Sequence, residues 1–159
     1  QVQGGITVRA VVQRVTSSKV SVDGKTVGEI GKGFNVLLGV VEGDTDEQAI
    51  LLAGKIARLR VFEDENGKMN LSVNDVGEIL AISQFTLCAD CKKGNRPSFT
   101  LSAAPDEANR LYELFCSELS ANGVRNVEKG IFGADMAVDI ANDGPVTIML
   151  DTDIWRKDK

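Results

Sequence analysis

VRAVVQRVTSSKVSVDGKTVGEIGKGFNVLLGVV, residues 8–41, is the stretch that decides the fold class. Val8 to Val15 is rich in β-branched residues, which predicts a strand. Val20 to Ile30 predicts a hairpin, because the Asp23-Gly24 dipeptide within it suits a type I′ turn. Phe34 to Val41 is an apolar run of strand length. Strands joined by such short turns favour a largely antiparallel sheet.

Two helices are predicted further along the chain. The first follows a capping box that begins at Thr45, and four apolar residues recur on one face of it: Ala49, Leu52, Ile56 and Leu59. The second is bracketed by Pro105 at its first position and by Gly123 beyond its end. Its apolar stripe has five members: Ala108, Leu111, Tyr112, Phe115 and Leu119. Each helix therefore has one face to bury.

The later strands complete the expected architecture. They are predicted at residues 60–62, 78 to about 87, 136–141 and 146–150. A loop from Cys88 to Ser98 follows the second of these strands, and a turn containing Gly144-Pro145 separates the last two. Strands outnumber helices, so the expected fold class is α+β. We expect a single mixed, largely antiparallel, barrel-like sheet with two main helices, and not a doubly wound parallel sheet.

Size and charge limit the possible functions. The chain has 159 residues, 43% of them apolar, which suits one domain with a proper core. Its 18 basic and 23 acidic residues give a net charge of -5, which argues against a protein that coats long stretches of phosphate backbone. Any RNA contact should be small and local. No window has the pattern of a signal peptide or a membrane span, so we expect a cytoplasmic protein that does not enter a membrane.

Two residue types bear on the chemistry. The chain contains no histidine, which removes the usual general base, the imidazole-based triads and the commonest zinc ligand. Cys88 and Cys91 have the spacing of a redox or metal motif, but no second pair accompanies them. We expect the cysteines to be reduced and no metal to be bound. The chain also lacks a Walker loop and a dinucleotide fingerprint, so no cofactor is expected.

Two short segments allow more than one interpretation from residue type alone. Ser83 and Thr86 lie near a strand end, where hydroxyl groups more often make hydrogen bonds than act as nucleophiles. Gly144-Pro145 is ordinarily a turn, since proline cannot donate to a strand ladder. A cis bond there is the less common possibility, and it would aim two backbone carbonyls in one fixed direction. Such a rigid turn could act as a steric gauge.

Six segments, in order along the chain, resemble those of D-aminoacyl-tRNA deacylases, also known as the D-tyrosyl-tRNA deacylase family. They are Arg9–Val15, Gly67–Leu71, Ser83–Leu87, Arg96–Phe99, Phe132–Met136 and Asn142–Thr147. The resemblance implies that residues 8–150 form a D-aminoacyl-tRNA deacylase-like domain. Residues 1–7 are then an extra N-terminal segment, because the family normally begins with methionine at the position of Val8. Residues 151–159 are expected to be a polar tail.

The resemblance also implies a homodimer with two active sites at the subunit interface. Ser83, Gln84, Phe85 and Thr86 of one subunit would form the catalytic pocket, largely through backbone groups. Gly144 and Pro145 of the other subunit, joined by a cis bond in the family, would obstruct an L side chain and so control chirality. Phe132 and Met136 are expected to bind the 3′-terminal adenosine of tRNA, although ordinary core packing is an alternative for each.

The implied activity is hydrolysis of the ester bond of D-aminoacyl-tRNA, and of mischarged glycyl-tRNA, which releases the amino acid. A ribose 2′-OH beside the ester could assist the reaction, and backbone N–H groups near Phe85 and Thr86 could stabilise the oxyanion. Two alternatives remain open at this stage. One is a non-catalytic module that binds the 3′ end of RNA. The other is a thiol redox or metal protein that uses Cys88 and Cys91.

Overall fold

Strand β1 (Arg9–Val22) is the centre of the sheet in the computed structural model, which describes residues 8–155. Its first half pairs antiparallel with β3 (Gly33–Gly39), and its second half pairs antiparallel with β2 (Lys25–Ile30). Both central residues of the β1–β2 turn have positive φ, 51° at Asp23 and 80° at Gly24. The predicted type I′ hairpin is therefore confirmed.

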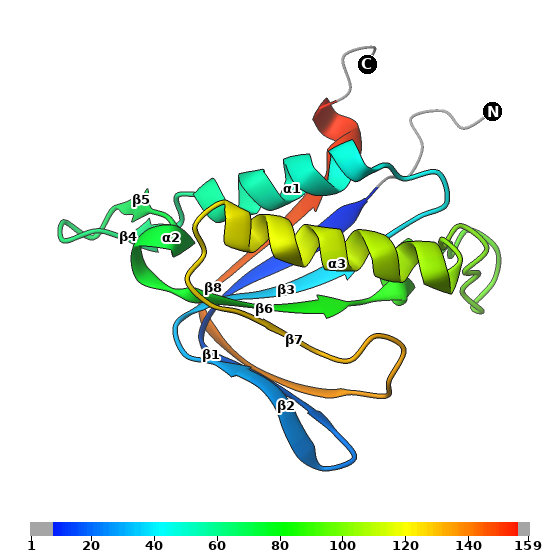
Figure 1. Ribbon diagram of the computed structural model, residues 1–159, viewed down its shortest axis with the longest axis horizontal. Helices are drawn as coiled ribbons and strands as arrows, with labels where there is room; N and C mark the ends of the chain where they lie inside the picture. Colours follow the sequence, from blue (N-terminus) through cyan, green and yellow to red (C-terminus); the bar gives the residue numbers. More distant parts are fainter. Residues whose placement is uncertain (1–7, 156–159) are drawn as a thin grey trace.

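A parallel section extends this antiparallel centre. β3 pairs parallel with β6 (Glu78–Ser83), and β6 pairs parallel with β7 (Val127–Lys129). β8 (Ala137–Asp151) pairs antiparallel with β1 along nearly its whole length. β2 also contacts β6 and β7, so the sheet curls towards a barrel (Figure 1). The predicted α+β class with a mixed, largely antiparallel, barrel-like sheet is confirmed.

Helices cover one face of this sheet. α1 (Asp46–Arg58) and α3 (Pro105–Ala121) pack against each other and over β3 and β6, as Figure 1 shows. The predicted capping box is present, since Thr45 N donates to Gln48 Oε1 at 2.8 Å and Gln48 N donates to Thr45 Oγ1 at 3.3 Å. Three short elements were not predicted: β5 (Met69–Leu71), which pairs with β4 (Phe62–Glu63), the single-turn helix α2 (Val73–Val76), and β7. Among residues 8–155, no helix has both the length and the apolar character needed to cross a membrane.

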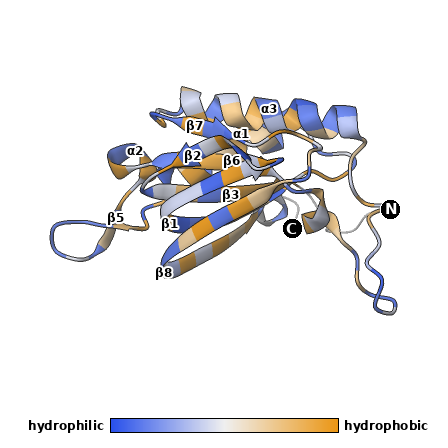
Figure 2. Ribbon diagram, turned by 90° about the horizontal axis from the view of Figure 1, so that it is seen from below, coloured by the Kyte–Doolittle hydropathy of each residue, from blue (hydrophilic) through white to orange (hydrophobic). Residues whose placement is uncertain are grey.

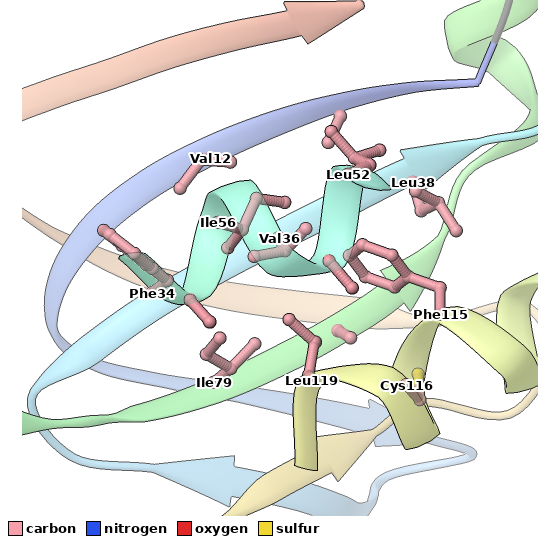
Figure 3. Packing of buried hydrophobic residues seen from close by; sticks show 14 of the residues in the cluster. Val12, Phe34, Val36, Leu38, Leu52, Ile56, Ile79, Phe115, Cys116 and Leu119 are labelled. Carbon is pink, nitrogen blue, oxygen red and sulfur yellow. The ribbon is translucent and has the colours of Figure 1, made fainter. Parts of the chain in front are cut away.

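The core has two parts because the curled sheet buries both of its faces. The larger part lies between the sheet and the helices, where Ile56 of α1 and Phe115 and Leu119 of α3 meet the side chains of β3 and β6 (Figure 3). The smaller part lies inside the curl and contains Val15, Val20, Ile30, Leu80 and Ile82. Bands of contrasting hydropathy alternate along β8, which has one side towards this inner cluster (Figure 2).

Several predicted strand boundaries were wrong. The short strand expected at residues 60–62 is β4, which covers only Phe62 and Glu63. The strand expected from Glu78 to about Leu87 ends at Ser83, and a 3₁₀ turn, η1 (Phe85–Cys88), follows it. This turn buries Cys88, whose Sγ donates to Val40 O at 3.4 Å. The two strands expected around Gly144-Pro145 are one strand, β8, because its pairing with β1 resumes on both sides of that dipeptide.

The polar tail expected from residue 151 is partly structured. Asp151 ends β8, and a short 3₁₀ helix, η2 (Thr152–Trp155), follows it. Thr152 is buried, and its N–H donates to Val8 O at 3.1 Å. The end of β8 is therefore held against the start of β1. The expected extra segment, residues 1–7, and residues 156–159 of the expected tail lie outside the described residues.

Candidate active site

A cavity of about 740 Å³ opens beside the end of β6. Its walls come from five parts of the chain: Val40 after β3, the end of β6, the start of η1, residues 99–108, and residues 132–138. Five of the predicted site residues line it: Ser83, Gln84, Phe85, Phe132 and Met136. Thr86, Gly144 and Pro145 do not line it. The fold thus brings together two segments that lie about fifty residues apart in the sequence.

Backbone and arginine contacts hold η1 in place. Gln84 N donates to Leu38 O at 2.7 Å, which continues the β3–β6 pairing by one residue. Gly39 lies directly behind the turn, where an added Cβ would be 2.9 Å from Leu87 Cβ. A larger residue there would push η1 outwards. On the far side of η1, Arg9 Nη1 donates to Leu87 O at 3.1 Å.

Two aromatic side chains stand at the mouth of the cavity. Phe85 is 57% exposed and Phe99 is 36% exposed. Their rings meet edge to face with centroids 5.1 Å apart. Such a pair stabilises by about 0.5–1.5 kcal/mol beyond its buried area. Phe99 lies in Arg96–Phe99, one of the six segments that resemble the family, but no role was predicted for it.

The opposite wall is supported from α3. Phe132 is half-buried and packs against Tyr112, with ring centroids 6.3 Å apart. Tyr112 is buried, and its hydroxyl donates to Ala81 O in β6 at 2.7 Å. Burial raises the pKa of Tyr112, so its phenol stays protonated and keeps this bond. Met136 packs against the inner core cluster.

Thr86 is exposed, has a local hydrogen bond and does not line the cavity. Gln84 Nε2 donates to Thr86 Oγ1. The backbone N–H groups of Phe85 and Thr86 begin the 3₁₀ turn, and within residues 8–155 they donate to no protein acceptor. Phe85 lines the cavity beside Ser83 and Gln84, and Thr86 is the next residue along the chain.

Gly144-Pro145 forms a bulge in β8 and is joined by a cis peptide bond. Gln13 of β1 faces Thr147, whereas Val15 faces Asn142, so the residues between Asn142 and Thr147 are extra on the β8 side. Gly144 and Pro145 are both exposed. The bulge therefore leaves the dipeptide at the surface, and neither residue lines the cavity.

Arg14 anchors this bulge. Its side chain is buried; Nε donates to Asp143 O at 3.2 Å and Nη1 donates to Val61 O at 2.7 Å. Asp143 also pairs with the same Nε through Oδ2 at 3.5 Å. Sequence reasoning gave Arg14 no role, although a charged residue in an apolar strand is a signal for a buried polar contact.

The thiols do not form a reactive pair. Cys88 and Cys91 are both free; Cys88 is buried and Cys91 is exposed. Burial raises the pKa of Cys88, whereas a reactive or metal-binding thiol needs a lowered pKa. No group of three or more histidine, cysteine, aspartate or glutamate side chains is arranged for a metal ion in the part of the chain that the structure describes.

Comparison with known sequences identifies many relatives. A family model described as D-Tyr-tRNA(Tyr) deacylase matches residues 11–151. A D-aminoacyl-tRNA deacylase of Clostridium novyi (strain NT) is 57% identical over 145 residues, which cover 91% of this chain and 97% of that protein. A D-aminoacyl-tRNA deacylase of Sulfurihydrogenibium sp. (strain YO3AOP1) is 60% identical over 144 residues, 90% of this chain and 97% of that protein.

Solved structures share the fold. A protein described as c-Myc DNA unwinding element binding protein superposes with a TM-score of 0.84 at 45% identity, over 89% of this chain and 97% of its own. A probable eukaryotic D-amino acid tRNA deacylase superposes with a TM-score of 0.78 over 92% of this chain and 100% of its own. At 22% identity, the second likeness concerns the fold alone.

Proposed function

The chain belongs to the D-Tyr-tRNA(Tyr) deacylase family and is a hydrolase that acts on D-aminoacyl-tRNA, and we propose that the cavity beside β6 binds the aminoacylated 3′ end of this substrate. One observation carries the proposal. One cavity is lined by both groups of predicted site residues. The residues expected at the ester are Ser83, Gln84 and Phe85, and those expected at the adenosine are Phe132 and Met136.

The terminal adenosine is assigned to the wall formed by Phe132 and Met136. Both side chains are half-buried, so each has surface available to a ligand. A cavity of about 740 Å³ has room for an adenosine and an amino acid, since ligand pockets commonly measure about 300–1,000 Å³. Stacking of a base on an aromatic ring contributes about 1–3 kcal/mol.

The ester is assigned to the wall formed by Ser83, Gln84 and Phe85, next to Thr86. Hydrolysis passes through a tetrahedral intermediate with a negative oxygen. The N–H groups of Phe85 and Thr86, which have no protein acceptor within residues 8–155, are suitable donors to that oxygen. Their position is held by the hydrogen bonds of Gln84 and Leu87, so they need not reorganise during the reaction.

Proton transfer need not come from a side chain. The chain contains no histidine, and the hydroxyl of Thr86 accepts a hydrogen bond from the amide of Gln84, which is not a base. The ribose 2′-OH lies next to the ester in any aminoacyl-tRNA. Held close to the carbonyl, it can position water or assist the reaction through proximity.

Chiral selection is assigned to Gly144 and Pro145 of a second copy. These residues are exposed and lie outside the cavity of their own subunit. The outer edge of β8 pairs with no strand among residues 8–155, and Met149 on this strand is 73% exposed. A two-fold homodimer formed through β8 would cover this surface and bring each Gly144-Pro145 to the partner's cavity.

In such a dimer the backbone carbonyls would obstruct an L side chain, while a D side chain would point into open space. Selection would then depend on excluding the wrong hand and not on reading the side chain. Glycine has no side chain to exclude, so glycyl-tRNA should be hydrolysed as well. Because the substrate belongs to translation, we expect the protein to work in the cytoplasm.

Matched D- and L-tyrosyl-tRNA test the proposal directly. We expect release of tyrosine from the D ester and much slower release from the L ester. Equal rates would contradict the chiral assignment, and binding without release would indicate a non-catalytic RNA-end module. A D-aminoacyl-tRNA that lacks the terminal 2′-OH tests the mechanism separately, and full activity on it would remove the 2′-OH from the mechanism.

The thiol alternative has its own test. Because the pKa of buried Cys88 is raised, we expect the double variant Cys88→Ser, Cys91→Ser to keep its activity wherever it stays folded. Thermal unfolding monitors folding, since a serine hydroxyl at the buried Cys88 position needs a hydrogen-bond acceptor. Val40 O, which already accepts from Cys88 Sγ, can serve. A folded but inactive double variant would support a role for the thiols.

A further inference from the structure

We propose that the loop at residues 91–97 binds phosphates of the substrate RNA just outside the cavity. Three cations define this surface, which we call the basic arm: Lys92, Lys93 and Arg96. The inference rests on the proposed function, because it assumes that the 3′ end of tRNA occupies the cavity. It adds a second contact region that recognises the RNA backbone and not the aminoacyl group.

The basic arm starts and ends at the cavity wall. It leaves the wall after η1 and returns to it at Phe99. Two backbone hydrogen bonds close its base, Asp90 N to Ser98 O at 2.7 Å and Ser98 N to Asp90 O at 2.8 Å. The arm is therefore a closed loop with a fixed root beside Phe85 and Phe99.

All the residues of the arm are exposed. Asp90 Oδ1 accepts from the backbone N–H of Lys92 at 3.0 Å, which occupies that carboxylate at the root of the loop. In Figure 1 the loop between η1 and α3 lies at the opposite end of the molecule from the β4–β5 hairpin. That hairpin carries the acidic residues Glu63, Asp64 and Glu65. The two ends of the molecule thus differ in charge.

The charges of the arm are not neutralised by the protein. Within residues 8–155, no carboxylate forms an ion pair with Lys92, Lys93 or Arg96. By contrast, Arg110 pairs with two carboxylates and Lys129 pairs with Glu113. These three cations lie within five residues of a chain whose net charge is -5. They provide a local attraction for an anion where the chain as a whole repels one.

RNA is the partner that fits this position. A polynucleotide whose last nucleotide lies in the cavity must leave through its mouth, so its preceding phosphates pass the root of the arm. Residues 91–97 form a loop that extends at most about 12 Å from its root, because the chain must run out over half of its residues and return over the other half. That reach covers the few phosphates next to the terminal nucleotide. The contact is small, as the acidic chain requires.

The test is the salt dependence of hydrolysis by the full chain. The variant Lys92→Gln, Lys93→Gln, Arg96→Gln removes three positive charges from the arm. The control Lys25→Gln, Lys68→Gln, Arg125→Gln removes the same three charges from exposed positions that do not line the cavity. Both variants and the native chain are assayed on D-tyrosyl-tRNA between 50 and 200 mM salt, and on a D-tyrosyl ester of adenosine.

We expect the arm variant to have a higher KM for the tRNA substrate. We also expect the slope of log kcat/KM against log salt to become less negative by about 2, because each of three lost single-strand contacts contributes about 0.7 to that slope. This slope corresponds to roughly a 20-fold change over the salt range. The control variant should keep the native slope, and hydrolysis of the adenosine ester should be the same for all three proteins.

Two results would overturn the basic arm. One is a native salt slope in the arm variant, which would assign the loop to another partner. The other is an equal loss on the adenosine ester, which would mean that the loop shapes the cavity. Either result leaves the deacylase proposal standing if the native chain hydrolyses D-tyrosyl-tRNA. A native chain inactive on both substrates would refute the proposed function itself.

Discussion

Arg14 of β1 holds Asp143 of β8, with Nε donating to the Asp143 carbonyl oxygen at 3.2 Å, one residue before the exposed Gly144. The same guanidinium donates from Nη1 to Val61 O. A planar group with several fixed donors can serve two carbonyls at once, whereas a lysine ammonium is a single point charge. The orientation of the Gly144-Pro145 bulge therefore depends on a side chain that lies in a different strand.

Replacing Arg14 by lysine should lower discrimination between D and L esters. We expect a loss of about 1.5–3 kcal/mol in the free energy of unfolding for the hydrogen bonds that are lost, and a D/L ratio of kcat/KM reduced by about tenfold or more. Arg58→Lys is the matched control, because Arg58 makes one exposed contact with Asn122. An unchanged D/L ratio of kcat/KM in Arg14→Lys would mean that the contacts of Arg14 do not control chiral selection.

Gly144→Ala should lower the stability of the fold. The φ of Gly144 is +123°, and an added Cβ would lie 3.0 Å from Val146 Cγ2 and 3.1 Å from Arg14 Nη2. Gly67→Ala is a control with positive φ, 76°, and open space around the added Cβ. We expect Gly67→Ala to cost about 1–2 kcal/mol in unfolding free energy and Gly144→Ala to cost more. Equal shifts in thermal unfolding would mean that the crowding at Gly144 is relieved.

Thr86→Ala should keep most of its activity. The Thr86 hydroxyl bonds to Gln84 and does not line the cavity, and the chain has no histidine to activate it. We expect kcat on D-tyrosyl-tRNA to fall by less than about tenfold, or about 1.4 kcal/mol. A trapped acyl-enzyme on Thr86, detected by mass spectrometry, would instead establish it as a nucleophile.

Phe132→Leu should weaken binding of the 3′ end. The substitution keeps an apolar side chain against Tyr112 but removes the ring available for stacking. We expect KM to rise by about 5- to 100-fold, from a stacking energy of about 1–3 kcal/mol, with little change in kcat. Leu114→Ala, a change in a partly buried side chain of α3 outside the cavity lining, tests whether loss of packing alone produces this effect.

The stability of the fold should fall as pH rises from about 4 to about 7. Burial raises the pKa of Asp44 to about 7, with Asp151 adding to the effect and Val41 N, Val8 and Arg9 opposing it. A carboxyl with a raised pKa in the folded state favours folding when protonated. Its contribution is therefore complete below the unfolded pKa of 3.8, declines up to about pH 7 and is constant above it.

The slope for one such group is at most about 1.4 kcal/mol per pH unit. Asp44→Asn should remove this slope, because an amide does not titrate. Its oxygen can still accept the hydrogen bond from Val41 N. Asp46→Asn is the control and should keep the native slope over this range, since the contact with Arg110 lowers the pKa of Asp46 and places its titration below 3.8. Denaturant unfolding between about pH 4 and 8 compares the two variants with the native chain. A native chain with constant stability over this range would contradict the assignment to Asp44.

Local rules in the sequence determined most of the elements. The Asp23-Gly24 turn and the Thr45 capping box each depend on neighbours within four residues, and both were predicted with the bounds that the structure has. The apolar stripes of the two helices and the mixed sheet also followed from residue spacing. Ordered resemblance along the chain pointed to the family, which the similarity to characterised deacylases supports.

Tertiary contacts decided where the strands end and which residues meet. β6 stops at Ser83 because the next turn buries Cys88 against Val40, and β8 continues past Gly144-Pro145 because β1 pairs with it on both sides. Neither partner is near in sequence, so no local pattern carries the information. The cavity depends on such distant contacts as well, since Phe132 packs on Tyr112 of α3, whose hydroxyl donates to Ala81 O of β6. The sequence by itself determined the local geometry and the family, and the assembled sheet decided the site.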